Sequence, residues 1–254
     1  MINVNCLNNI AACGLKLFSD EYNTESSFED AQAVLVRSAK MHDMELPESV
    51  AVIARAGAGV NNIPVKECAE KGIVVFNTPG ANANGVKELV LAGMLLASRD
   101  IVGGIEWVQR EKDQEDIDKL AEKQKKQFAG CEISGKKLGI IGLGKIGKMV
   151  AKKAAIGLDM KVISYIPRPE GKEISEYVKA VPLEQLLKES DFISLHVPGG
   201  AKNQNLIGKK EQEQMKESAF LLNLSRGGVV NESEFAEAVR KKQIAGGALA
   251  VFAK

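Results

Sequence analysis

The sequence has few of the residues from which metal and redox sites are built. Its 254 residues include two histidines and four cysteines, and Cys6, Cys13, Cys68 and Cys131 show no Cys-x-x-Cys spacing. Structural zinc sites need four such ligands at short, regular spacings, and redox-active cysteine pairs need the same kind of proximity. We therefore expect no metal site and four reduced thiols with a mostly structural role.

The sequence also lacks a strong charge of one sign and a long apolar run. Its formal net charge is +1, and the most charged stretch, residues 110–126, mixes acidic and basic residues. Because nucleic-acid-binding domains usually cluster their lysines and arginines, we expect no nucleic-acid partner. No apolar stretch reaches membrane-spanning length and no N-terminal signal pattern is visible, which predicts a soluble, cytoplasmic protein without a membrane partner.

Short apolar runs alternate with polar or helical stretches along the whole chain, which is 45% hydrophobic. The runs occupy residues 3–7, 33–38, 50–56 and 73–77, and then residues 138–141, 161–166, 177–181, 191–197, 220–225 and 247–252. Such alternation predicts an α/β protein with parallel sheets covered by helices. We expect a smaller unit over residues 1–83 and, over residues 84–254, a doubly wound parallel sheet whose six strands match a dinucleotide domain.

Several stretches between these runs favour helices. Residues 86–98 are apolar on nearly every face, with Asn84 as N-cap, which predicts a buried helix between two domains. Residues 107–128 form a charged amphipathic pattern, for which a solvated face is the default interpretation and a subunit contact the alternative. Residues 182–188 and 209–216 are also helical in pattern. Asn231 with Glu234 resembles a capping box that opens a helix over residues 233–242.

Residues 136–147 run from an apolar strand pattern into three glycines and then into an amphipathic helix. Gly142 permits a tight turn out of the strand, Gly144 has no side chain to obstruct a diphosphate, and Gly147 permits close packing of helix and strand. The phosphates would lie at the helix N-terminus, where N–H groups and the positive end of the helix dipole converge. Glycine-rich turns also arise by chance, but the flanking strand and helix favour a dinucleotide-binding turn.

Two loops in the first unit follow strands, at the edge where parallel sheets place ligands. They are residues 37–40, which begin with Arg37, and residues 55–62, which begin with Arg55 and contain Gly57 and Gly59. The glycines free backbone N–H groups, and guanidinium groups suit a carboxylate or phosphate. Alternatively, the glycines serve only a turn and the arginines are solvated. The loops alone leave both interpretations open.

Five motifs, in the same order, resemble those of the D-2-hydroxyacid dehydrogenases, and most closely the bacterial D-3-phosphoglycerate dehydrogenases of serine biosynthesis. The motifs are Val36-Arg-Ser-Ala39, Arg55-Ala-Gly-Ala-Gly-Val-Asn-Asn-Ile-Pro64, Phe76-Asn-Thr-Pro-Gly80, Gly142-Leu-Gly-Lys-Ile-Gly147 and Leu224-Ser-Arg-Gly-Gly-Val-Val230. The resemblance covers essentially the whole chain, and the motifs are specific as a set. It implies a Rossmann dinucleotide domain, a smaller flavodoxin-like α/β substrate domain, and an active site in the cleft beside the helix after Gly85, which acts as a hinge.

The resemblance also implies roles for individual residues. Arg37 and Arg55 match arginines that hold the phosphate end of the substrate, and the backbone of residues 57–61 matches the loop that holds its carboxylate. Arg226 matches the catalytic arginine that orients the substrate's carboxylate and carbonyl, although a purely structural ion pair is the alternative. The substrate loop consists of Gly57, Ala58, Gly59, Val60 and Asn61. The cofactor is expected against Gly142, Gly144, Lys145, Ile146, Gly147, Ile166, Arg168, His196, Val197, Pro198, Leu224, Ser225, Arg226 and Ala250.

Three departures from the family pattern bear on activity. The acid expected to bind the adenine ribose falls at Ile166, which cannot accept a hydrogen bond. Ala250 replaces the family's aspartate in the sixth strand. The catalytic glutamate and histidine that follow this strand have no counterpart up to Lys254, so the chain is expected to be a shortened one. Neither His196, which matches a cofactor-packing position, nor His42, in a polar loop, is expected to replace them.

The sequence thus favours an NAD-dependent oxidoreductase that acts on a small anionic 2-hydroxy acid, with 3-phosphoglycerate implied by the resemblance. NADP is possible as well, because Ile166 neither binds the 2′-hydroxyl nor repels a 2′-phosphate, which Arg168 could accept. The resemblance suggests a homodimer built through the dinucleotide domain. The rival hypothesis is a catalytically silent nucleotide-binding fragment or degenerate homologue, so turnover by this chain is in doubt.

Overall fold

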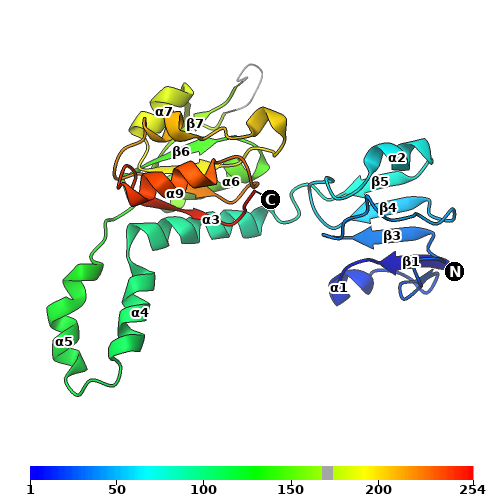
Figure 1. The fold of residues 1–254 in the computed structure, drawn as a ribbon, viewed down its shortest axis with the longest axis horizontal. Helices are drawn as coiled ribbons and strands as arrows, with labels where there is room; N and C mark the ends of the chain where they lie inside the picture. The colour runs from blue at the N-terminus through cyan, green and yellow to red at the C-terminus, as the bar shows by residue number, and fades with distance from the viewer. Residues whose placement is uncertain (168–173, 254) are drawn as a thin grey trace. The chain divides into compact units, whose positions relative to one another are not determined.

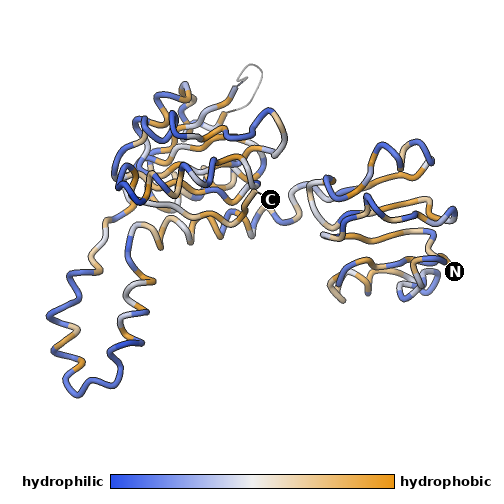
Figure 2. The backbone as a smooth tube through the Cα atoms, viewed as in Figure 1, coloured by the Kyte–Doolittle hydropathy of each residue, from blue (hydrophilic) through white to orange (hydrophobic). Residues whose placement is uncertain are grey.

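The chain divides into two compact units, residues 1–82 and residues 83–254, which we call unit 1 and unit 2 (Figure 1). The computed structural model describes residues 1–167 and 174–253. Each unit is built on one parallel sheet, of five strands in unit 1 and six in unit 2. The predicted α/β class with parallel sheets is therefore confirmed, and in Figure 2 hydrophobic residues gather along the strands of both sheets.

Unit 1 has the strand order β2-β1-β3-β4-β5, and all its strand pairs are parallel. Its elements are β1 (Ile2–Cys6), α1 (Ala12–Leu15), β2 (Tyr22–Asn23), β3 (Ala33–Val36), β4 (Val52–Arg55), α2 (Val65–Glu70) and β5 (Val74–Asn77). Strand β2 was not expected from the sequence, because two residues are too short to show a periodic pattern. Val34, Val36, Ile53 and Cys68 are completely buried in the core.

The four cysteines are unpaired in the structure. Cys68 lies in the core of unit 1, whereas Cys13 and Cys131 are exposed. A packing role therefore applies to Cys68 and not to the two exposed thiols.

Unit 2 has the strand order β11-β10-β9-β6-β7-β8. Numbered within the unit this is 6-5-4-1-2-3, the order of a doubly wound dinucleotide domain. The strands are β6 (Lys137–Ile141), β7 (Lys161–Tyr165), β8 (Val178–Ala180), β9 (Phe192–Leu195), β10 (Phe220–Asn223) and β11 (Gly246–Leu249). Apolar clusters cover both faces of the sheet, so its central strands are almost completely buried, as parallel strands require.

The helices of unit 2 include α3 (Ala83–Ser98), α4 (Ile101–Glu111), α5 (Ile117–Gln124), α6 (Lys145–Lys152), α7 (Leu183–Glu189), α8 (Lys209–Gln212) and α9 (Glu232–Arg240). Helix α6 continues as a π-helical turn over Lys153–Gly157, and short 3-10 turns occupy Lys125–Phe128 and Ala201–Asn203. Among the residues that the structure describes, no helix is both long and apolar enough to cross a membrane.

Helix α3 differs from its prediction in two respects. It begins at Ala83, so Asn84 lies inside the first turn, where its Nδ2 donates to Glu88 Oε1 at 2.7 Å instead of capping the helix. Only one stripe is buried, because the helix packs by one side on α6, β10 and β11: Val90 and Met94 are completely buried, while Leu89 on another face is 52% exposed. Within unit 2 the helix is therefore buried on one side only, while its predicted burial between two domains stays a prediction.

The single helix expected over residues 107–128 is instead a hairpin of α4 and α5 (Figure 1). The polar run between residues 112 and 116 contains no apolar side chain to continue the buried stripe, and the chain turns there. Trp107 holds the two helices together: its Nε1 donates to Gln124 Oε1 at 2.9 Å, and its ring packs against that of Phe128 in a T-shaped contact. Amphipathic periodicity alone did not reveal the break.

Two other helix predictions need correction. Helix α8 ends at Gln212 rather than at residue 216, since the following residues form tighter turns. At the start of α9, Asn231 Oδ1 accepts from Glu234 N at 3.3 Å, but Glu234 Oε2 accepts from Lys209 N at 2.6 Å and does not return to Asn231. Only one of the two hydrogen bonds of the predicted capping box is therefore formed. The Glu234 side chain, which would have made the other, links α9 to α8 instead.

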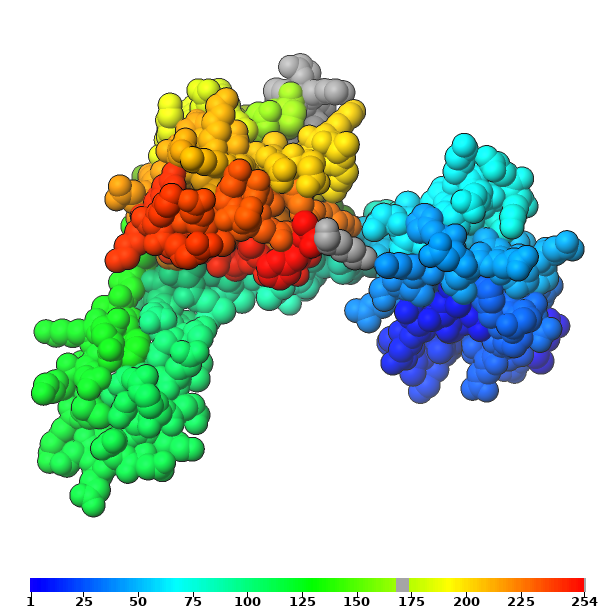
Figure 3. Space-filling view, in the orientation of Figure 1, coloured from blue at the N-terminus to red at the C-terminus, as the bar shows by residue number. Residues whose placement is uncertain are grey.

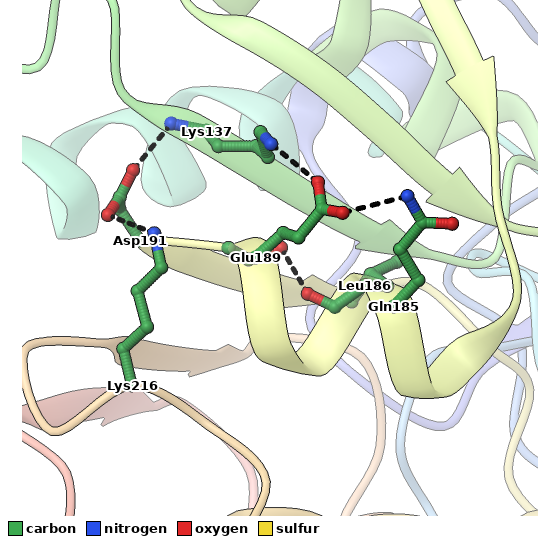
Figure 4. Close-up of polar contacts among 7 residues, drawn as sticks. Lys137, Gln185, Leu186, Glu189, Asp191 and Lys216 are labelled. Carbon is green, nitrogen blue, oxygen red and sulfur yellow. Dashed lines mark hydrogen bonds and ion pairs between the residues drawn. The ribbon is translucent and has the colours of Figure 1, made fainter.

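An ion-pair network fixes the amino ends of β6 and β9 (Figure 4). Asp191 accepts from the Lys137 N–H at 2.7 Å and from Lys216 Nζ at 2.8 Å, and Lys137 Nζ lies 2.5 Å from Glu189 Oε2. Burial raises the pKa of the Asp191 carboxyl, but these hydrogen bonds outweigh it and lower the pKa overall. The network lies at the opposite end of β6 from the glycine turn, so its role is structural.

Candidate functional site

Two glycines of the turn after β6 are required by the backbone itself. Gly142 has φ +100°, and a Cβ on it would lie 2.6 Å from the carbonyl oxygen of His196. A Cβ on Gly147, in the first turn of α6, would overlap the carbonyl oxygen of Gly142. A side chain at either position would overlap the backbone. Glycine at both positions therefore lets helix α6 pack closely against strand β6, as the sequence predicts.

Gly144 is different, because, apart from its own chain neighbours, no atom of residues 1–167 and 174–253 lies within 4 Å of the place where its Cβ would be. It is the N-cap residue of α6, and no side chain caps that helix end. The amino end of α6 therefore begins at a residue without a side chain, beside space that no described side chain fills. This is the arrangement that a dinucleotide's diphosphate needs, so the residues present fit the group.

The strand ends next to this turn bring other predicted site residues together. A Cβ on Gly142 would lie 3.0 Å from Cγ1 of Val197, after β9, and one on Gly199 would lie 3.3 Å from Cγ of Arg226, after β10. Because β6, β9 and β10 are neighbours in the sheet, the glycine turn, residues 196–198 and residues 224–226 form one continuous edge. Ala250 follows β11 at the same edge, where its N–H donates to Asn223 O at 3.1 Å.

Asn223 holds Arg226 in place and was not identified from the sequence. It is 1% exposed; its Nδ2 donates to Arg226 O at 2.9 Å, and its Oδ1 accepts from the N–H and hydroxyl of Ser225. The Arg226 side chain is exposed, and its Nη1 donates to Ser225 O at 2.7 Å. The sequence did contain a signal for this role, because Asn223 ends an apolar strand and a buried amide side chain needs hydrogen-bond partners.

The His196 ring is enclosed at this edge. Its Nε2 lies 2.9 Å from Ser194 Oγ, and its Nδ1 is buried without a hydrogen-bond partner among the residues that the structure describes. Burial lowers the pKa of His196 to about 4, so the ring is neutral at pH 7. A neutral, enclosed ring suits packing against a ligand better than proton transfer near pH 7.

Burial of His196 makes the stability of the chain depend on pH. An unfolded histidine titrates near pH 6.5, so between pH 6.5 and about 4 the unfolded state binds a proton that the folded state does not. We expect the free energy of unfolding to keep its full value above pH 6.5 as far as His196 is concerned. It should fall as the pH is lowered, by roughly 1–3 kcal/mol at pH 4.5. Urea unfolding at pH 7 and 4.5 measures it, and His196→Gln should reduce the difference between the two pH values. If the free energy of unfolding fell equally between pH 7 and pH 4.5 in both proteins, the buried His196 would not be the cause of the fall.

At the end of β7, Ile166 lies beside the glycine turn, because Gly142 N donates to Tyr165 O at 3.4 Å. The Ile166 side chain is 8% exposed and offers no acceptor to a ribose. Arg168, the predicted partner of a 2′-phosphate, lies outside the described residues.

The two arginine loops of unit 1 lie at the carboxyl ends of neighbouring strands. Arg37 directly follows β3 and is exposed, and Arg55 ends β4. The Arg55 guanidinium folds over its own loop, since a Cβ on Gly57 would lie 2.6 Å from Arg55 Nη1. In the same loop, Asn61 O lies 3.0 Å from Nε2 of His42, so this histidine is tied to the backbone.

Comparison with known proteins places these features in a family. Residues 91–254 match the family model described as D-isomer specific 2-hydroxyacid dehydrogenase, NAD binding domain. A D-3-phosphoglycerate dehydrogenase of Methanocaldococcus jannaschii is 38% identical over 230 residues, which cover 88% of this chain and 42% of that protein. A hydroxypyruvate reductase of Thermotoga maritima is also 38% identical, over 88% of this chain and 70% of that protein.

Among solved structures, the TT0316 protein of Thermus thermophilus has a TM-score of 0.84 and 25% identity, covering 99% of this chain and 82% of that one. The chain spans less than half the length of the M. jannaschii relative. The family model, the relatives and the doubly wound strand order agree. This chain belongs to the D-isomer specific 2-hydroxyacid dehydrogenase family.

Proposed function

We propose that this chain is part of an NAD(P)-dependent oxidoreductase that transfers a hydride between nicotinamide and a small D-2-hydroxy acid. The observation that carries the proposal is the open space at Gly144, in a turn where Gly142 and Gly147 are sterically required. A diphosphate would take up this space, and residues 196–198 and 224–226 would lie along the rest of the cofactor. When bound, the nicotinamide accepts or gives the hydride at carbon 2 of the substrate.

Arg226 is proposed to hold the carboxylate and carbonyl of the substrate. Its exposed guanidinium presents a planar donor fork, and Asn223 fixes the backbone from which it extends. A guanidinium remains protonated, so Arg226 orients the substrate but cannot accept the hydroxyl proton.

Residues 1–82 are proposed as the substrate domain and residues 83–254 as the dinucleotide domain. Within the first, Arg37 and Arg55 follow neighbouring strands at one edge of the sheet, and residues 57–61 lie in the second loop. Two guanidinium groups favour a substrate with an anionic group besides its carboxylate. This supports 3-phosphoglycerate over smaller 2-oxo acids, although relatives of both kinds match the chain.

The rival proposal is a chain that binds the dinucleotide without turnover. Ala250 favours it, because an exposed methyl group stands at the end of β11 where the family pattern has a carboxylate. The two proposals are separated by measuring NADH formation from 3-phosphoglycerate and NAD alongside NAD binding. Oxidation of the substrate supports the oxidoreductase, binding without oxidation supports the rival, and failure to bind contradicts both.

The replacement of the ribose-binding acid by Ile166 predicts weak discrimination between NAD and NADP. An acid at this position attracts the 2′-hydroxyl and repels a 2′-phosphate, and isoleucine does neither. We expect the dissociation constants of NAD and NADP to differ by less than about a hundredfold, the scale of a few kcal/mol. Fluorescence titration of both nucleotides measures this. The Ile166→Asp variant should shift the ratio towards NAD by about tenfold or more, and an unchanged ratio would show that residue 166 does not face the ribose.

We also propose that the α4–α5 hairpin pairs with a second copy of the chain. Helix α4 exposes Ile101, Val102, Ile105 and Val108, which are 42–58% exposed. Three of them line a groove of about 500 Å³ whose lining is mostly apolar but includes Gln109 and Lys125. The hairpin is the green part of unit 2 in Figure 3. An exposed apolar face of this kind marks an interaction surface. Sedimentation equilibrium should give twice the chain mass, and Ile105→Glu should give the monomer. A monomeric parent chain would contradict the dimer.

A further inference from the structure

Three asparagine side chains link the strand ends of unit 1, and none of them was predicted from the sequence. Each bonds to the backbone of a loop that follows another strand. Asn8 Oδ1 accepts the N–H groups of Arg37, Ser38 and Ala39 at 2.8, 2.9 and 3.0 Å; Asn62 Nδ2 donates to Ala39 O at 2.8 Å; Asn77 Nδ2 donates to Ala58 O at 2.7 Å.

The three links follow the order of the sheet. Asn8 comes after β1 and bonds to the loop after β3, while Asn62 joins the loops after β3 and β4, and Asn77 joins β5 to the loop after β4. In the order β1-β3-β4-β5, one asparagine thus links each neighbouring pair of strands. The two loops joined in the middle are those that contain Arg37 and Arg55.

Asn8 also decides how the first loop can recognise an anion. Successive backbone N–H groups that converge on one point form a typical anion-binding nest. Here the amide oxygen of Asn8 already occupies the nest formed by residues 37–39. Recognition of an anion by this loop is therefore left to side chains, above all to the exposed guanidinium of Arg37.

Asn62 provides a second fixed point. It is 8% exposed, its side chain reaches Ala39 O, and its backbone carbonyl accepts from Met41 N at 2.8 Å. The first loop is therefore held from both sides, by Asn8 and by Asn62. Ordering a loop before a ligand arrives reduces the entropy lost on binding.

We propose that Asn8, Asn62 and Asn77 are positioning residues that hold the loops of Arg37 and Arg55 ready for the anionic end of the substrate. This inference rests on the proposed substrate role of the two arginines. The asparagines act on the backbone of the loops and leave the ligand to the guanidinium groups.

The test is a double-mutant cycle on the full chain, with binding of 3-phosphoglycerate measured calorimetrically in the presence of saturating NADH. Asn8→Ala should raise the dissociation constant about five- to twentyfold, and Arg37→Ala at least as much. If Asn8 acts through Arg37, the double variant should bind no more weakly than Arg37→Ala alone. The matched control is Asn3→Ala, which removes asparagine hydrogen bonds from the other end of β1 and should leave the constant unchanged.

A second cycle pairs Asn77→Ala with Arg55→Ala. Asn77 is exposed, so its loss should leave the chain folded even if Asn8→Ala does not fold. In both cycles the dissociation constant of NADH should stay unchanged.

The outcomes distinguish failure of the proposed substrate role from failure of the proposed positioning role. If the arginine variants bind 3-phosphoglycerate as well as the parent chain, the proposed substrate role of the arginines fails. If they bind weakly but the asparagine effects are absent or simply additive, the positioning role is wrong and the substrate site stands. Tighter binding by Asn8→Ala would also overturn the inference, because it would mean that Asn8 competes with the anion for the three N–H groups.

Discussion

The Gly144→Ala variant is expected to fold as stably as the parent chain, to within about 1 kcal/mol, and to lose most of its affinity for NAD. Beyond the chain neighbours of Gly144, the added methyl group meets no atom of the described residues within 4 Å, and the backbone there, with φ −81°, is open to alanine. The methyl group would instead enter the space proposed for the diphosphate. We expect the dissociation constant of NAD to rise by about tenfold or more, measured by fluorescence titration.

Gly142→Ala is the matched comparison, because we expect it to reduce the stability of the fold, which Gly144→Ala should leave unchanged. Its φ of +100° and the nearby carbonyl oxygen of His196 mean that a methyl group there strains the fold itself. We expect a loss of about 1–3 kcal/mol in the free energy of unfolding, measured with urea. If Gly144→Ala kept the parent affinity for NAD at unchanged stability, the space beside Gly144 would not be the diphosphate site.

Replacement of Arg226 is expected to remove most of the affinity for the substrate's carboxylate while leaving NADH binding intact. A charge-assisted hydrogen bond contributes about 1.5–3 kcal/mol, so Arg226→Gln should raise the dissociation constant of 3-phosphoglycerate by about ten- to a hundredfold. Calorimetry in the presence of NADH measures the constant without requiring turnover. Arg226→Lys should lie between the parent and the glutamine variant, because it keeps the charge but loses the planar fork.

Arg240→Gln serves as the control for Arg226, since Arg240 is an exposed arginine of the same unit that ends α9. It should bind 3-phosphoglycerate like the parent chain. If the Arg226 and Arg240 variants bound 3-phosphoglycerate equally well, the Arg226 side chain would not hold the substrate.

The sheets and the glycine turn could be predicted because their determinants are local. Parallel strands buried on both faces appear as short apolar runs, and Gly142, Gly144 and Gly147 lie within six residues. The resemblance to the D-2-hydroxyacid dehydrogenases, which rests on five short motifs, was confirmed by the family model and the relatives.

The rest could not be predicted, because it depends on contacts between residues far apart in sequence. Asn8 bonds to residues about thirty positions away, and nothing near it in the sequence indicates those partners. The packing of α4 on α5 depends on Trp107 meeting Phe128, and the exposure of Leu89 on α3 depends on which elements the helix meets. Glu234 likewise had a plausible local partner in Asn231 and bonded to Lys209 instead.

A crystal structure of the chain with NADH bound would show directly whether the dinucleotide binds at the glycine turn. We predict that the diphosphate lies against Gly144, with its oxygens accepting hydrogen bonds from the N–H groups of Lys145 and Ile146, and that the nicotinamide lies towards Arg226. A dinucleotide bound with its diphosphate away from Gly144, or no dinucleotide in crystals soaked at millimolar concentration, would contradict this prediction.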